Sequence, residues 1–175
     1  MPIKSLKNIS GNVQFKVSIL QTDEFFKDKT ILSIIEQIKS NFPFTFIAKG
    51  KLQKAVNQLA GFFWIKNDKG EYLIVNDKYS KLLGAKPAKI EGSSEAELLP
   101  GYYKKLFNLI DKYIILSGNI VSIKGINPTF QISGNENTEI IEFPLIDMDE
   151  NVVAIIGLNR INEKDGNDSS TNLTA

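Results

Sequence analysis

The side chains that most often do chemistry in proteins are missing here, because the sequence contains no cysteine and no histidine. Their absence excludes disulfides, thiolate nucleophiles, Ser–His triads and the usual zinc ligands. It also removes the commonest general base near neutral pH. An enzyme built on carboxylates would need two acids converging in a cleft, with the pKa of one raised. No spacing of Asp and Glu suggests such a pair, so we expect no enzyme.

One acidic run has the residue types of a calcium loop without its spacing. Asp147-Met148-Asp149-Glu150-Asn151 begins like an EF-hand, which needs Gly at its sixth position and Glu at its twelfth. Those positions are Val152 and Leu158, both inside an apolar run that is typical of a strand. We therefore predict a hairpin turn here and expect no metal site.

Length and composition fit one domain with extensions at its ends. The chain has 175 residues, of which 42% are hydrophobic, and a formal net charge of +1. Its charges are interspersed without an apparent basic face, so we expect no nucleic-acid partner. Residues 1–11 lack the apolar run of a signal peptide, and no stretch of about 18 apolar residues could span a bilayer. We expect a cytoplasmic protein without membrane insertion.

Residues 1–50 are predicted to be an N-terminal extension to which no role is assigned. Alternating apolar residues in 12–20 predict a strand, and helical spacing after Thr30 predicts a helix that ends before Pro43. Residues 44–47 are expected to be extended. At the other end, residues 163–175 are polar, with no apolar side chains to offset the entropy of ordering, and we predict a disordered tail.

A helix is predicted over residues 51–60, with Gly61 suited to the position after its end. Its apolar face must be covered, either by the chain's own sheet or by a partner in a dimer, and both can be true. The candidates for a dimer interface are Leu52, Val56 and Leu59.

The stretch from Phe62 to Ile161 has the order strands, helices, strands. Ser94 and Glu97 have the spacing of a capping box, and a longer helix opens at Pro100 and ends at Gly118. The last strand, 152–158, is apolar without alternation, so both faces of the sheet should be covered. The layout predicts an α+β domain: a small antiparallel sheet with helices packed over one face.

Four short motifs in this stretch, taken in order, resemble those of a PAS domain, the sensor module of bacterial sensor histidine kinases and related signalling proteins. They are the turn Asn67-Asp68-Lys69-Gly70, Val75-Asn76 before a helix that ends Leu82-Leu83-Gly84, Pro144-Leu145-Ile146-Asp147, and Ile156-Gly157. The resemblance implies a PAS fold over residues 51–162, with 51–60 as its N-terminal flanking helix.

Departures from the family's patterns reduce the set of cofactors that this chain could bind. Without Cys, a Cys-linked flavin or chromophore is excluded, and without His so is His-ligated haem. Noncovalent flavin, a small metabolite, a fatty acid or an empty apolar core remain open. The family's junction to an output domain resembles Arg160-Ile161-Asn162-Glu163, and no kinase or cyclase motif follows. The chain is therefore a stand-alone protein or a fragment of a larger sensor, such as the separated sensor part of a histidine kinase.

The resemblance implies a ligand pocket between the sheet and the helices of residues 77–117. Asn159 stands where flavin-binding light sensors carry a Gln, and its amide could both donate to and accept from a ligand. Glu142 should share this face, at the rim or paired with Lys66 or Lys124, because a bare buried charge is costly. The pocket candidates, each of which could instead be core packing, are Trp64, Tyr79, Leu83, Phe107, Ile110, Ile140, Ile155, Gly157 and Asn159.

Two functions follow from the resemblance. The first is a sensor that binds a small ligand noncovalently and signals through rearrangement of a homodimer or of a contact with a signalling partner. The second is a ligand-free interaction module. A pocket of about 300 Å³ or more would favour the sensor. The eleven Phe, five Tyr and one Trp favour a filled core.

Overall fold

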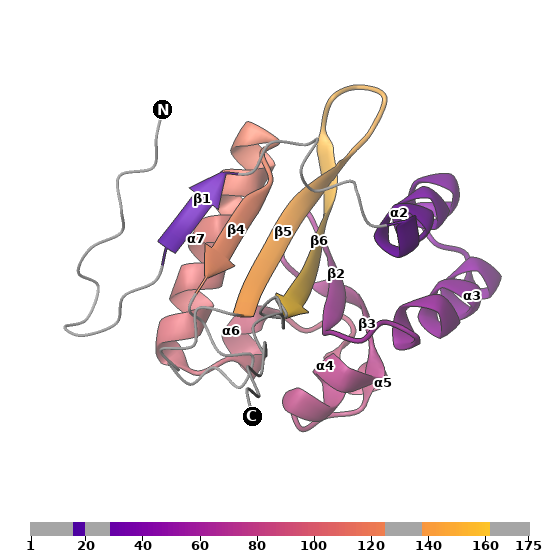
Figure 1. The fold of residues 1–175 in the computed structure, drawn as a ribbon, viewed down its shortest axis with the longest axis horizontal. Coiled ribbons are helices and arrows are strands. Elements are labelled where there is room, and N and C mark those ends of the chain that lie inside the picture. Colours follow the sequence, from indigo (N-terminus) through magenta and orange to yellow (C-terminus); the bar gives the residue numbers. More distant parts are fainter. Residues whose placement is uncertain (1–15, 20–28, 125–137, 162–175) are drawn as a thin grey trace, which may run out of the picture.

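The computed structural model describes residues 16–19, 29–124 and 138–161, which build one antiparallel sheet with helices on both faces (Figure 1). The sheet has six strands in the order β1-β4-β5-β6-β2-β3. Their bounds are Lys16–Ile19 (β1), Phe63–Asn67 (β2), Tyr72–Val75 (β3), Val121–Lys124 (β4), Thr138–Ile146 (β5) and Val152–Ile161 (β6). The predicted α+β class and antiparallel sheet are confirmed.

One face of the sheet, which we call the inner face, is covered by four helices. They are α4 (Asp77–Leu82), α5 (Pro87–Ile90), α6 (Glu95–Leu98) and α7 (Gly101–Ser117). Ser94 and Glu97 form the predicted capping box at the start of α6. Gly118 ends α7 in the left-handed conformation, with φ of 65°, as its type predicts. These caps set where α6 begins and where α7 ends along the chain.

The opposite, outer face is covered by α2 (Lys29–Asn41) and α3 (Phe46–Asn57). Helix α2 buries Ile34, Ile35 and Ile38, and α3 buries Leu52 and Val56. Strand β6 runs between the two layers, which explains why its sequence is apolar without alternation. The prediction that both faces of the sheet are covered is confirmed.

The N-terminal part of the chain differs from the prediction in three places. Phe46 and Ile47 are helical, not extended, because the Thr45 hydroxyl caps α3 by accepting the amide hydrogen of Ala48. The helix ends at Asn57, so Gly61 is not its terminator. Gly61 instead lies so close to β6 that a Cβ there would be 2.5 Å from the carbonyl oxygen of Asn159.

Strand β1 joins the sheet by pairing with β4, so at least this part of the N-terminal extension belongs to the same sheet. The rest of the predicted strand over 12–20 and the predicted tail over 163–175 lie outside the described residues. Within the described ranges, none of the helices combines the length and the hydropathy needed to cross a membrane.

Asn76 ties the two layers together at the start of α4. Its side-chain oxygen accepts the amide hydrogens of Phe63 at 3.1 Å and Tyr79 at 3.0 Å. Its side-chain nitrogen donates to the carbonyl oxygens of Val56 at 3.3 Å and Gly61 at 2.8 Å. The side-chain amide thus donates two hydrogen bonds and accepts two, and these bonds offset the free-energy cost of burying it completely.

Candidate functional site

A buried lysine lies at the centre of the inner face. Strand β2 projects Trp64 and Lys66 toward the helical layer, since side chains two apart in a strand share a face. The Lys66 Nζ donates to Glu95 Oε1 at 2.7 Å, Asp111 Oδ1 at 2.6 Å and Glu142 Oε1 at 2.9 Å. These acids come from α6, α7 and β5, so the ammonium joins two helices to two strands. We call these four residues the Lys66 cluster.

Aromatic side chains surround the Lys66 cluster. The Trp64 indole donates to Glu142 Oε1 at 3.2 Å and stacks on Tyr79, with ring centroids 4.6 Å apart. The hydroxyls of Tyr72 and Tyr79 are 2.9 Å apart, and that of Tyr72 lies 3.5 Å from Glu95 Oε1. The second carboxylate oxygen of Glu142 is buried without a hydrogen-bond partner among the described residues.

Three carboxylates around one ammonium give this buried site an excess of negative charge, and the pKa values respond. Burial raises the pKa of Glu95 to about 8 and that of Glu142 to about 7, against the opposing pull of Lys66. Burial also raises the pKa of Asp111. Burial alone would lower the pKa of Lys66, but the three carboxylates, Asp111 foremost, raise it well above its usual value. Lys66 therefore keeps its positive charge, and the three acids hold their protons to higher pH than they would in water.

The geometry of the Lys66 cluster also matches a set of metal ligands, since one oxygen from each of its three acids lies within 4.8 Å of the others. Carboxylate oxygens suit hard divalent cations, which they bind at about 2.0–2.6 Å. The Lys66 ammonium already lies among these oxygens at 2.6–2.9 Å, in the place that an ion would take. The centre of the site is filled by a tethered cation, and we assign it no metal.

Six of the predicted pocket residues are buried together on the inner face: Trp64, Tyr79, Phe107, Ile110, Ile140 and Ile155. Leu83 is partly buried against them. Gly157 lies opposite Trp64 in the β2–β6 pair, and a Cβ there would be 2.0 Å from the indole ring. In this structure these side chains contact one another. Their role in binding a ligand stays a prediction.

Asn159 lies opposite Ile140 of this group in the β5–β6 pair, but it is not part of the apolar cluster. Its side-chain oxygen accepts the amide hydrogen of Phe62, next to the start of β2. The amide predicted to read a ligand is thus engaged with the backbone here.

Glu142 pairs with Lys66, as one of the sequence alternatives predicts, and it is fully buried and not at a rim. Sequence reasoning missed Glu95 and Asp111, the two further partners of Lys66. Asp111 offers a signal, because it lies four residues after Phe107 on the apolar stripe of α7, where a solvated acid is out of place. Nothing comparable marks Glu95, which reaches the site only through the position of α6.

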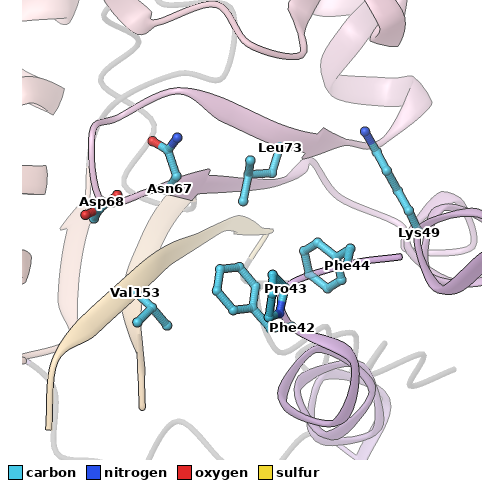
Figure 2. A pocket seen from close by; sticks show the side chains of 8 residues that line it. All are labelled: Phe42, Pro43, Phe44, Lys49, Asn67, Asp68, Leu73 and Val153. Atoms are coloured by element: carbon cyan, nitrogen blue, oxygen red, sulfur yellow. The ribbon is translucent and has the colours of Figure 1, made fainter. Parts of the chain in front are cut away.

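A second site lies on the outer face, where Figure 2 shows the connection between α2 and α3 facing the strands of the sheet. The cavity there has a volume of about 470 Å³. It is lined by Phe42, Pro43, Phe44, Lys49, Asn67, Asp68, Leu73 and Val153. Lys49 is paired with Glu91 at 2.5 Å, and the Asn67 side chain bonds to its own turn and to Glu71. Most of the other lining residues are apolar or aromatic.

The candidates for a dimer interface lie on the same outer face. Leu52 and Val56 are buried against the chain's own sheet, and Leu59 is partly buried beside them. Their packing inside one chain is the first of the two alternatives left open by the sequence. A dimer contact through this helix remains a prediction.

Comparison with solved structures identifies the architecture. A crystal structure of a sensory box sensor histidine kinase from Vibrio cholerae matches 67% of this chain and 96% of its own, with a TM-score of 0.51 and 11% sequence identity. The fold is that of a PAS domain. No family model matches the chain, and no curated protein sequence matches it significantly.

Two further PAS-like matches correct one expectation. A VqmA–ligand–DNA complex from Vibrio cholerae matches 68% of this chain and 52% of its own (TM-score 0.47, 14% identity). The structure of an RNA-binding Light-Oxygen-Voltage receptor matches 85% of this chain and 38% of its own (TM-score 0.49, 14% identity). The exclusion of nucleic-acid partners, which rested on interspersed charge alone, is therefore wrong, because proteins that this chain matches bind DNA or RNA. This chain spans about half the length of the VqmA chains that it matches.

Proposed function

We propose that this chain is a regulatory PAS module of a signalling protein, and that the space between its inner face and helices α4–α7 is a closed core and not a ligand pocket. The observation that carries this proposal is the contact between Trp64 and Gly157. The largest side chain of the domain lies against the one position of β6 that has no side chain. It occupies the space where the resemblance puts a ligand.

The surroundings of Trp64 support the same conclusion. Tyr79 stacks on the indole, and Glu142 accepts its N–H, so the ring is held on its face and at its edge. A ligand entering here would have to move a ring that is 2% exposed and separate the charges of the Lys66 cluster. Both steps cost free energy that contacts with a small molecule would have to supply.

The output of such a module is proposed to pass through a contact with a second copy or with a signalling partner. The separated sensor part of a histidine kinase is one form that such a chain could take. This part of the proposal rests on the family alone.

A second candidate function is a noncovalent sensor for a small apolar or aromatic molecule, with the outer-face cavity as its site. Its volume of about 470 Å³ lies within the range of small-molecule pockets. The aromatic rings of Phe42 and Phe44 supply the apolar surface that such ligands need.

Native mass spectrometry of the purified protein, with an absorbance spectrum of the same sample, tests both candidates. A ligand-free module predicts the bare chain mass of 19.6 kDa, or its multiples, and no absorbance beyond that of aromatic residues. A co-purifying small molecule would contradict the ligand-free proposal. Leu73→Trp would then locate that molecule: loss of the ligand in this variant places it in the outer cavity, and retention places it elsewhere.

A further inference from the structure

The Lys66 cluster holds more negative charge than its one ammonium can balance. Within the described ranges, Lys66 is the cation that makes ion pairs with Glu95, Asp111 and Glu142. The side chains of these four residues are at most 8% exposed. With all three acids ionised the cluster would carry two uncompensated charges away from water, which is a costly state.

A cation must therefore neutralise part of this excess, and the site leaves little choice of cation. The centre between the three carboxylates is taken by the ammonium at 2.6–2.9 Å. Aromatic and aliphatic side chains close the surroundings. A proton is the cation that needs no room. Glu142 offers it an acceptor, because its Oε2 is buried and has no hydrogen-bond partner among the described residues.

We propose that the Lys66 cluster is a proton-binding site and that gain or loss of its proton is the input to which this PAS module responds. The inference rests on the proposed function, since it names the signal for the same closed core. Among the residues that the structure describes, the titratable groups that face the cluster, in addition to its own members, are Tyr72 of β3 and Tyr79 of α4. Burial raises the pKa of both tyrosines, so they stay neutral donors.

The proton would act on the helical layer because of what the cluster connects. Glu95 and Asp111 anchor α6 and α7 to Lys66 on β2, and Glu142 anchors β5 to the same atom. Loss of the proton adds a negative charge that repels the other two carboxylates. That repulsion weakens the attachment of α6 and α7 to the sheet. The pKa values of about 7 for Glu142 and about 8 for Glu95 put this change near neutral pH.

The chain contains its own reporter, since its one tryptophan donates its indole N–H to Glu142. We would follow the ¹H–¹⁵N signal of the Trp64 indole and the tryptophan fluorescence of the whole chain from about pH 5.5 to about 9. The expected result is a reversible transition with its midpoint near pH 7–8. Glu142→Gln should abolish or displace it. The matched control Glu36→Gln, at an exposed position of α2, should leave it unchanged.

A flat indole signal over this range in the wild-type protein would overturn the proposal, as would an unchanged transition in Glu142→Gln. If Glu142→Gln does not fold, Glu95→Gln and the ¹³C shifts of labelled Glu carboxyls give the same test. Carboxyls that all titrate below about pH 5 would refute the site. The ligand-free proposal is tested separately, because a co-purifying molecule would contradict it whether or not Trp64 titrates.

Discussion

Trp64 and Gly157 face each other across the β2–β6 pair, and the indole lies where a side chain of residue 157 would be. A Cβ built on Gly157 would come within 2.0 Å of the ring, a distance at which something must move. Strand β6 thus gives up a side chain so that a tryptophan can fill the interior. In the proposed function, this contact closes the space where the family resemblance places a ligand.

Gly157→Ala should destabilise the domain by about 1–3 kcal/mol or more, because the methyl group overpacks a closed interior. Urea unfolding followed by circular dichroism measures the change. Gly50→Ala is the matched control: residue 50 lies inside α3 with no atom within 4 Å of a new Cβ, and Ala there should stabilise by about 0.5–1 kcal/mol. If Gly157→Ala were as stable as the wild type, Trp64 would have room to move and the core would not be closed.

Lys66→Met should destabilise the fold by about 3–5 kcal/mol at neutral pH, because it leaves three buried carboxylates without their cation. The loss should shrink at about pH 5, where protonated acids no longer repel one another. Lys49→Met serves as the control, since it breaks a lysine–carboxylate pair that is about one-third exposed and should cost about 1 kcal/mol or less. Equal losses in the two variants would show that the cluster carries little of the stability.

The free energy of unfolding should fall as pH rises from about 5 to about 9. The folded-state pKa values of Glu95 and Glu142, about 8 and about 7, lie above the ordinary value of 4.5. The folded state therefore holds more protons than the unfolded chain between these values. The resulting stability is fully present below the ordinary pKa and is lost as pH passes through the raised ones. Urea midpoints across this range measure the slope, and Glu95→Gln combined with Glu142→Gln should flatten it. A slope of the opposite sign would mean that these acids are ionised throughout.

Much of the inner layer could be predicted from local sequence. The capping box at Ser94, the glycine stop at Gly118 and the hairpin turn at Asn67 are each set by a few neighbouring residues, and the structure has them in place. The alternation in β2 and β5 likewise put Trp64 and Glu142 on one face. Such features need no knowledge of distant contacts.

The Lys66 cluster could not be predicted in the same way, because its members are brought together only by the complete fold. Lys66 and Asp111 are 45 positions apart, and Glu142 follows Lys66 by 76. The local sequence suggests the pair of Glu142 with Lys66 and marks Asp111 as an acid on an apolar stripe, but it does not show that these residues and Glu95 meet at one atom. The start of α3 was missed for a different, local reason: residues 44–47 were predicted to be extended, and the Thr45 cap starts the helix at Phe46.

Val56→Asp distinguishes the two interpretations of the helix predicted over residues 51–60. Val56 is completely buried against the outer face of its own sheet, so a carboxylate there should cost several kcal/mol and prevent folding at neutral pH. Circular dichroism and sedimentation of the purified variant measure folding and association together. Lys51→Asp, at an exposed position of the same helix, should fold like the wild type. A Val56→Asp protein that folds as a monomer, where the wild type is a dimer, would instead place this face of α3 in the contact between two copies.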